Sequence, residues 1–270
     1  MPNPILLLRL EGPLQSWGTR SRWDVRDSGD EPTKSGVIGL LGCALGLERG
    51  HPMLLELDRG LRFGVRVENA GRKVTDYQTI TDFLPTAAGA FKMSGSKTAS
   101  TIEAARRSGA PATVISPRDY LEDAAFLVGL EARAGAEGLL KKAAEKVQTP
   151  RWPLFLGRKA CVPVRPIFAD FTAQYQDLEA ALMRYPWEWL GFLRESKPDA
   201  FKNQGRPERE RLPQRLNGWI ETDDPLAPGA VSRQDALESN RARVYGFRLA
   251  EPFTVSLDNL DSSNLNEVQL

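Results

Sequence analysis

An apolar run of strand length, a long polar connector and an apolar helix follow one another near the N-terminus, and this order constrains the fold more than any other feature. Residues 5–8 (ILLL) form the apolar run, which ends at Gly12 and Pro13 because both residues favour turns. Residues 37–47 are apolar over about three helical turns. Glycines at positions 36, 39, 42 and 46 fall near one face of this helix and would let it pack closely on a sheet.

The connector between these two elements is rich in residues that suit RNA. Aromatic rings stack on bases, guanidinium groups bind phosphates, and hydroxyls form hydrogen bonds to either. We expect Trp17 to stack on a base, because its flanking residues are polar and flexible. Lys34 and Ser35 stand at the helix start, where Ser35 would either bind a phosphate or only cap the helix. The candidate RNA-binding residues of the connector are Gln15, Trp17, Arg20, Arg22, Arg26, Thr33, Lys34, Ser35 and Gly36.

Positive charge is concentrated in two further segments, although the net charge of the 270 residues is only +1 and is no argument for nucleic acid by itself. Residues 72–118 carry seven Lys and Arg against three Asp and Glu, and residues 141–165 carry seven against one. Such clustering favours contact with a polyanion. The candidate phosphate contacts in these segments are Lys92, Lys97, Arg106, Arg107, Arg118, Arg158 and Lys159.

The remaining pattern of the first 148 residues predicts an α+β domain with an arm. Residues 61–68 alternate like a strand, residues 119–133 form a hydrophobic strand, and residues 134–147 have helical composition. Between them, residues 72–117 hold few apolar positions and two strand-like ends. We expect a long protruding hairpin arm there, whose tip at 86–110 is mobile without a partner. The order matches a ferredoxin-like (RRM-like) domain with an inserted arm, the general shape of RNA-recognition folds.

Residues 149–270 read as a second unit, a small β-rich C-terminal domain. Prolines and glycines punctuate its start, a short helix is predicted at 177–184, and the last strand is predicted at 244–257. Within it, residues 195–235 are predicted to be an exposed insertion, since 195–218 are highly charged and contain few core-forming residues.

The composition also limits the cofactors and the compartment. Cys43 and Cys161 are too few and too far apart in sequence for a metal site, so no metal or other cofactor is expected. The N-terminal apolar run is too short for a signal peptide, and no later stretch approaches about 18 apolar residues. We therefore expect a cytoplasmic protein with no membrane partner.

Four segments resemble one known family. They are LRLEGPLQSWG at 8–18, RSRWDVRDSGDEPTKSGVIGLLGCALG at 20–46, RDYLEDAAFLVGLEA at 118–132 and PLFLGRKACVP at 153–163. The chain is similar to the CasD family of type I-E CRISPR Cascade subunits, the fifth group of Cas proteins. The resemblance implies a ferredoxin-like domain with an arm-like thumb, a grip on the 5′ handle of the crRNA, and contacts with the CasC backbone and the large subunit CasA. It favours RNA contact for Arg20 and Arg22 over a solvated face of ion pairs with the neighbouring acidic residues.

Three classes of function remain open from the sequence. A non-catalytic RNA-binding scaffold needs basic and stacking residues but no acid–base pair. A metal-independent endoribonuclease is the alternative, because a sister branch in type I-C systems processes precursor crRNA. It needs a general base, yet His51 is the only histidine and is expected in a solvent-facing turn, and neither Tyr77 nor Tyr120 has an adjacent lysine or histidine. A protein-interaction adaptor is the third class and overlaps with the first. We expect the scaffold, a subunit of an antiviral surveillance complex.

Overall fold

A seven-stranded antiparallel sheet forms the centre of the protein. The computed structural model describes residues 3–19, 26–187, 215–239 and 244–260. The strand order is β11-β12-β10-β3-β8-β1-β9, and each neighbouring pair runs antiparallel. The strands are β1 (Ile5–Glu11), β3 (Leu61–Asn69), β8 (Ala125–Ala132), β9 (Phe168–Thr172), β10 (Arg215–Thr222), β11 (Val231–Leu237) and β12 (Tyr245–Ser256).

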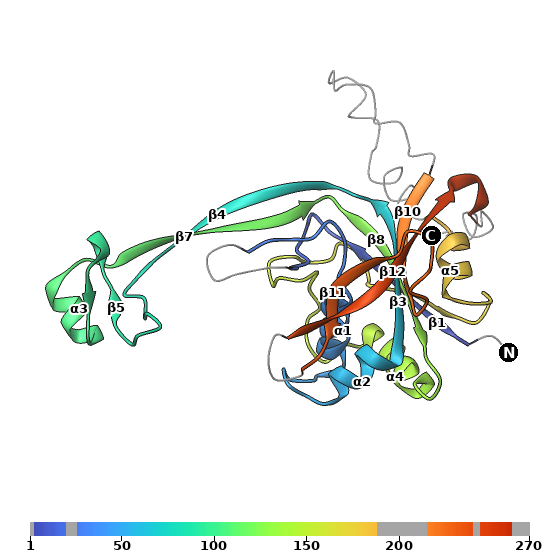
Figure 1. Cartoon of the computed structure of the whole chain (residues 1–270), viewed down its shortest axis with the longest axis horizontal. Coiled ribbons are helices and arrows are strands. Elements are labelled where there is room, and N and C mark those ends of the chain that lie inside the picture. The colour runs from blue at the N-terminus through green and yellow to red at the C-terminus, as the bar shows by residue number, and fades with distance from the viewer. Residues whose placement is uncertain (1–2, 20–25, 188–214, 240–243, 261–270) are drawn as a thin grey trace, which may run out of the picture.

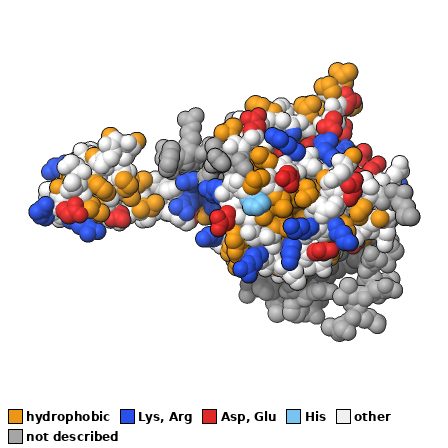
Figure 2. All heavy atoms as spheres, turned by 90° about the horizontal axis from the view of Figure 1, so that it is seen from below, with side chains coloured by type: hydrophobic (Ala, Val, Ile, Leu, Met, Phe, Trp, Pro, Cys, Tyr) orange, Lys and Arg blue, Asp and Glu red, His pale blue; other side chains and the backbone are white. Residues whose placement is uncertain are grey.

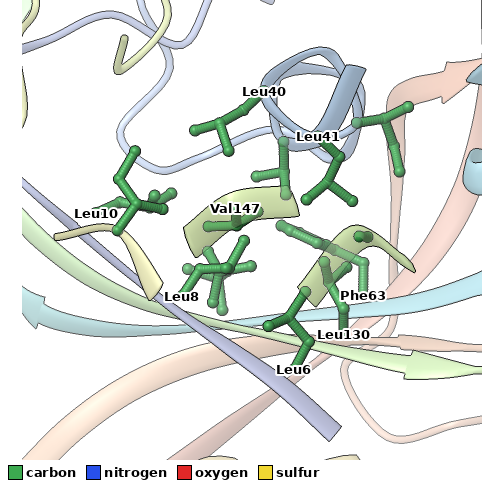
Figure 3. Close-up of a cluster of buried hydrophobic side chains, with 14 of the residues drawn as sticks. Leu6, Leu8, Leu10, Leu40, Leu41, Phe63, Leu130 and Val147 are labelled. Carbon is green, nitrogen blue, oxygen red and sulfur yellow. The ribbon is translucent and has the colours of Figure 1, made fainter. Parts of the chain in front are cut away.

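Helices cover both faces of this sheet. The larger core lies under α1 (Lys34–Leu45), α2 (Met53–Gly60) and α4 (Glu137–Gln148), and the smaller one lies under α5 (Leu178–Arg184). Because side chains alternate along a strand, Leu6, Leu8 and Leu10 of β1 enter the larger core, and Ile5 and Leu7 enter the smaller one. Figure 3 shows Leu6, Leu8 and Leu10 in the larger core, below the side chains of α1 and near Val147 of α4.

The glycines of α1 do not face the sheet, so that prediction is wrong. A Cβ on Gly42 would lie 2.7 Å from Leu54 of α2, and one on Gly36 would lie 3.0 Å from the Trp17 ring. Gly39 is exposed, with nothing within 4 Å of such a Cβ. The glycines admit α2 and the connector instead, while bulky residues such as Ile38 and Leu41 fill the sheet side of the helix.

A long hairpin leaves the body of the protein. Strands β4 (Arg72–Asp82) and β7 (Ala112–Glu122) pair without interruption from Arg72↔Glu122 to Asp82↔Ala112, and Figure 1 shows them extending far from the sheet. Strand β2 (Leu14–Gln15) pairs with the end of β7 at the body. We call β4, β7 and the residues between them the arm, and we call its end at the body the arm root.

The tip of the arm, residues 83–111, has secondary structure of its own. It contains β5 (Phe91–Lys92), the short helix η1 (Ser94–Ser96), β6 (Thr98–Ala99) and α3 (Ile102–Ser108). Met93 and Ala105 are buried within it. Figure 1 shows the tip far from the body, and its contacts are within the tip and with the end of β7.

Two predicted segments differ from the structure. The single strand predicted at 119–133 is divided, because β7 ends at Glu122 and β8 begins at Ala125, with Asp123 between them at φ 56°. Residues 215–235 are not an exposed insertion, since they contain β10 and β11. The high charge before residue 215 concealed the alternation of β10, whose Leu216 and Ile220 are buried. The rest of the predicted insertion, up to residue 214, lies outside the described residues.

The C-terminal strands do not form a sheet of their own. β10 pairs with β3 from Gly218↔Arg66 to Ile220↔Gly64, and β9 pairs with β1 on the other side. An edge strand with free backbone groups accepts a further strand, so both halves of the chain share one sheet. Within the described residues, every helix is too short or too polar to cross a membrane.

Candidate nucleic-acid interface

The start of α1 is closed by carboxylates from the C-terminal strands. The Lys34 ammonium donates to both Glu221 carboxylate oxygens, at 3.0 and 2.8 Å, and the Lys34 side chain is only 3% exposed. The backbone N–H of Lys34 donates to Asp235 Oδ2 at 2.7 Å. A helix N-terminus attracts anions, and here the protein supplies them itself. The prediction that Lys34 holds a phosphate is therefore wrong.

The N-cap of α1 is Thr33 and not Ser35. Thr33 Oγ1 accepts a hydrogen bond from the backbone N–H of Gly36 at 3.2 Å, and helical geometry begins at Lys34. Ser35 lies inside the first turn and is half-buried. Thr33 and Gly36 are thus engaged in capping the helix, which corrects their prediction as RNA contacts.

Gln15 and Trp17 belong to the core and do not form a base-stacking surface. Trp17 is 1% exposed, and its indole N–H donates to Gln15 Oε1 at 3.0 Å. The Gln15 amide donates to the carbonyls of Leu10 and Ala124, at 3.0 and 2.7 Å. The backbone N–H of Trp17 donates to Ser28 Oγ at 2.9 Å. The polar flank misled the prediction, because Gln15 is the group that satisfies the buried indole, while Ser28 satisfies the backbone N–H of Trp17.

Arg158 fastens the connector to the arm root. Its guanidinium donates to the carbonyls of Asp119 and Arg26, at 3.0 and 2.8 Å, and lies 4.6 Å from the centre of the Tyr120 ring. Nη2 also lies 3.4 Å from the carbonyl of Asp27, so these contacts hold the guanidinium against the protein and a structural role replaces the predicted phosphate contact. Lys159, the next residue, is exposed and forms no ion pair with a described carboxylate.

Arg26 and Arg118 lie at the arm root and form no ion pair with a carboxylate of the described residues. The backbone of Arg26 forms a parallel bridge with Arg118 of β7, and its N–H donates to the carbonyl of Pro117 at 3.0 Å. Arg118 Nε is buried and has no hydrogen-bond partner among the described residues. Its cross-strand neighbour Asp76 accepts from Gln78 at 2.8 Å instead. A buried donor without a partner is costly, and the positive charge of Arg118 has no carboxylate partner among the described residues.

Figure 2 shows Lys and Arg side chains gathered where the arm meets the body, and others over the tip. The predicted contacts Lys92, Lys97, Arg106 and Arg107 are all exposed at the tip. Because the tip and the root lie at opposite ends of the arm, these cations do not form one compact site with Arg118. Arg20 and Arg22 lie outside the described residues.

The sequence reasoning missed an apolar face in the middle of the arm. Tyr77 is 71% exposed and Ile115 is 59% exposed, and cross-strand pairing of Tyr77 with Pro117 and of Thr79 with Ile115 puts all four residues on one side of the ribbon. Arg118 belongs to the other side, because side chains alternate along β7. The alternation along each strand, which puts Tyr77 with Thr79 and Ile115 with Pro117, was the signal in the sequence, whereas the pairing of the two strands comes from the structure.

Comparisons with known proteins agree with this architecture. The family model described as CRISPR-associated protein (Cas_Cas5) matches residues 5–223. The chain belongs to this family. It is 32% identical over 189 residues to the CRISPR system Cascade subunit CasD of Escherichia coli (strain K12), a match covering 67% of this chain and 76% of the relative.

Two solved structures are similar to this Cas_Cas5 family member over nearly its whole length. One is a crystal structure of a Cas protein, with 30% identity, a TM-score of 0.61, and 95% of this chain and 97% of that chain covered. The other belongs to a CRISPR RNA-guided surveillance complex, with 25% identity, a TM-score of 0.62, and 97% and 95% covered. The family match includes the connector, the arm and Arg158, whereas Asp235, which closes the start of α1, lies beyond residue 223.

The histidine and tyrosines considered for catalysis do not meet in this family member. His51 is exposed, and its Nδ1 accepts a hydrogen bond from the backbone N–H of Met53 at 3.2 Å, as expected for a turn residue. Tyr120 is 3% exposed under Arg158, and Tyr77 lies out on the arm. A general base must lie within hydrogen-bond reach of the proton that it removes, and these groups come from three separate places.

Proposed function

We propose that this chain is the subunit of a type I-E Cascade complex that holds the 5′ handle of the crRNA and caps the backbone, for antiviral defence. Family membership and 32% identity to a Cascade subunit of known name support this role. The observation that carries it is the pair of arginines at the arm root, Arg26 and Arg118, which have no ion-pair partner in the part of the chain that the structure describes. The backbone bridge holds Arg26 next to Arg118, and two neighbouring positive charges suit an RNA phosphate.

The element order supports a ferredoxin-like core for this role. β1, α1, β3, β8, α4 and β9 follow one another as βαββαβ, and their strands take the order β3-β8-β1-β9 in the sheet. Both crossover helices lie on the same face. The arm is inserted between β3 and β8, in the position expected for a thumb.

The two sides of the arm suit different partners. The side of Arg118 and the basic tip suit RNA phosphates, whereas Tyr77, Ile115 and Pro117 offer an uncharged apolar face that suits a protein. We assign that face to the adjacent backbone subunit, CasC, and place the handle along the arm root. The large subunit CasA would contact the same end of the complex.

We propose a non-catalytic role, with no metal or cofactor in it. Connector, arm root and arm can capture a short single-stranded RNA end by phosphate contacts alone. Incubation of the protein with precursor crRNA, with and without EDTA, should leave the RNA intact. Specific cuts in the repeat that survive chelation would establish the endoribonuclease instead.

Arg118→Gln tests the RNA site directly, with Arg72→Gln as the matched control. Arg72 lies on the same ribbon but is already paired with Glu122. The slope of log affinity for handle RNA against log salt should fall by about 0.7 for each phosphate contact that a substitution removes. We expect that fall for Arg118→Gln and little change for Arg72→Gln. Equal effects of the two variants would show that only net charge matters and would overturn the assignment.

A further inference from the structure

A second group of basic side chains lies on the helical side of the body. Lys141, Lys142 and Lys146 are exposed on α4, and Arg151 is exposed in the turn that follows it. We call these four residues the α4 basic patch. Figure 2 shows Lys and Arg side chains over this helical side of the molecule.

The charges of the α4 basic patch are not neutralised by ion pairs. None of its four residues lies within ion-pair distance of a described carboxylate, whereas Lys34, Arg62 and Arg165 are each paired. The helix has two exposed acidic residues of its own, Glu137 and Glu145, so the patch keeps an excess of positive charge. Surfaces of this kind attract polyanions.

The patch is held on rigid elements. Lys146 and Arg151 line one open hollow of about 420 Å³, together with Gly46 at the end of α1. The backbone N–H of Arg151 donates to the carbonyl of Ala44 at 2.9 Å, and a Cβ on Gly46 would lie 2.6 Å from Arg151 Cγ. Lys142 precedes Lys146 by one turn and shares its face. The backbone that carries these cations is therefore held in place, with Lys146 in the last turn of α4, Lys142 one turn before it, and Arg151 against the C-terminal end of α1.

This position separates the patch from the RNA site proposed above. The connector and arm root lead into the N-terminal end of α1, whereas Arg151 caps its C-terminal end. The 12 residues of α1 span about 18 Å. A short RNA end held at the arm root would not need the patch.

We infer that the α4 basic patch binds backbone phosphates of a double-helical nucleic acid. Lysines and arginines without carboxylate partners contact phosphates and carry no base recognition. Capture of an unstacked single strand also uses aromatic rings. The four residues of the patch are not aromatic, but the 37% exposed Trp152 follows Arg151, so single strands are compared with duplexes in the test. The inference goes beyond the proposed function, because it concerns a second nucleic acid on another part of the surface.

The double variant Lys142→Gln/Lys146→Gln tests this inference in the complex assembled with crRNA. The control is Arg184→Gln/Arg215→Gln, which removes the same charge from exposed residues of α5 and β10. For a duplex without a sequence match, the slope of log affinity against log salt should fall by about 1.8 in the Lys variant, at about 0.9 for each contact. It should not change in the control.

Duplex DNA, duplex RNA and single strands are compared in the same assay, and crRNA content is measured in parallel. A lower salt slope for duplex DNA or for duplex RNA, with intact crRNA content, supports the inference. The duplex that shows the lower slope is then the ligand of the patch. The inference is overturned if the slope of the Lys variant is unchanged. It is also overturned if the slope falls equally in the control variant or equally for single strands. A fall in crRNA content would place the patch in the handle site and would also overturn the inference. If Arg118→Gln alone leaves the salt slope for handle RNA unchanged, that result counts only against the proposed handle site.

Discussion

The ammonium of Lys34 lies 3.0 and 2.8 Å from the two carboxylate oxygens of Glu221, 187 residues further along the chain. Glu221 also accepts from the backbone N–H of Phe63 at 3.1 Å and from Arg133 at 3.2 Å. This buried network joins the first helix to a C-terminal strand. It explains why a lysine in a connector that suits RNA is not available to RNA.

Glu221→Ala should destabilise the protein more than Lys34→Met does. Removing the carboxylate leaves Lys34 buried without its partner, and breaking a buried ion pair in this way lowers the free energy of unfolding by about 3–5 kcal/mol. Removing the ammonium leaves Glu221 with Arg133 and the N–H of Phe63. Denaturant unfolding of both variants measures the difference. Lys34→Met with normal stability and weakened RNA binding would contradict the structural role of Lys34.

The elements with clear periodicity could be predicted from the sequence. The helix beginning near Lys34, the strand at 61–68 and the helix at 134–147 are all present, because apolar spacing records burial directly. The roles of Trp17 and Arg158 could not be predicted. Their partners are carbonyls and side chains distant in the sequence, and those interactions exist only once the sheet has formed.

Trp17→Ala should lower the free energy of unfolding by about 3–5 kcal/mol, the usual loss when a buried indole is removed. Trp152→Ala is the control, since that ring is 37% exposed and surface substitutions usually stay within about 0.5 kcal/mol. Chemical denaturation followed by circular dichroism measures both. A normal unfolding midpoint for Trp17→Ala, together with loss of RNA binding, would restore the base-stacking role.

Asp58→Asn should stabilise the protein at neutral pH and lose this advantage in acid. Burial raises the pKa of Asp58 from 3.8 to about 6, an effect that Lys34 only partly offsets. The folded state therefore holds the proton more tightly than the unfolded state, so stability from this group is present below about pH 4 and is lost as the pH rises through about 6. The free energy of unfolding of the variant minus that of the native chain should grow by up to about 3 kcal/mol between about pH 4 and pH 8. A difference that stays constant with pH would show that Asp58 does not titrate in this range.

Replacing residues 86–110 by a short Gly-Ser link should spare the fold and impair assembly. The tip lies far from the body and supplies no residue to its hydrophobic clusters, so the packing of the sheet stays intact. The melting temperature should change by no more than a few degrees, whereas entry into the complex should fall. Arm shortening that leaves assembly, crRNA content and target binding normal would show that the tip has no role in the complex.

Tyr77→Ser/Ile115→Ser separates the two sides of the arm. If the apolar face contacts the backbone subunit, assembly should weaken while handle RNA binds the isolated chain normally. Thr79→Ser is the control on the same side of the ribbon. Weaker RNA binding with normal assembly would assign this face to RNA.

In the proposed function, the arm root, and not the start of α1, binds the crRNA handle. One titration of handle RNA tests this claim, with the native chain, Arg118→Gln and Lys34→Met compared across a range of salt. We predict that Arg118→Gln binds more weakly and with a lower salt slope, by about 0.7, while folded Lys34→Met binds like the native chain. Weaker binding by Lys34→Met with native affinity in Arg118→Gln would contradict the claim.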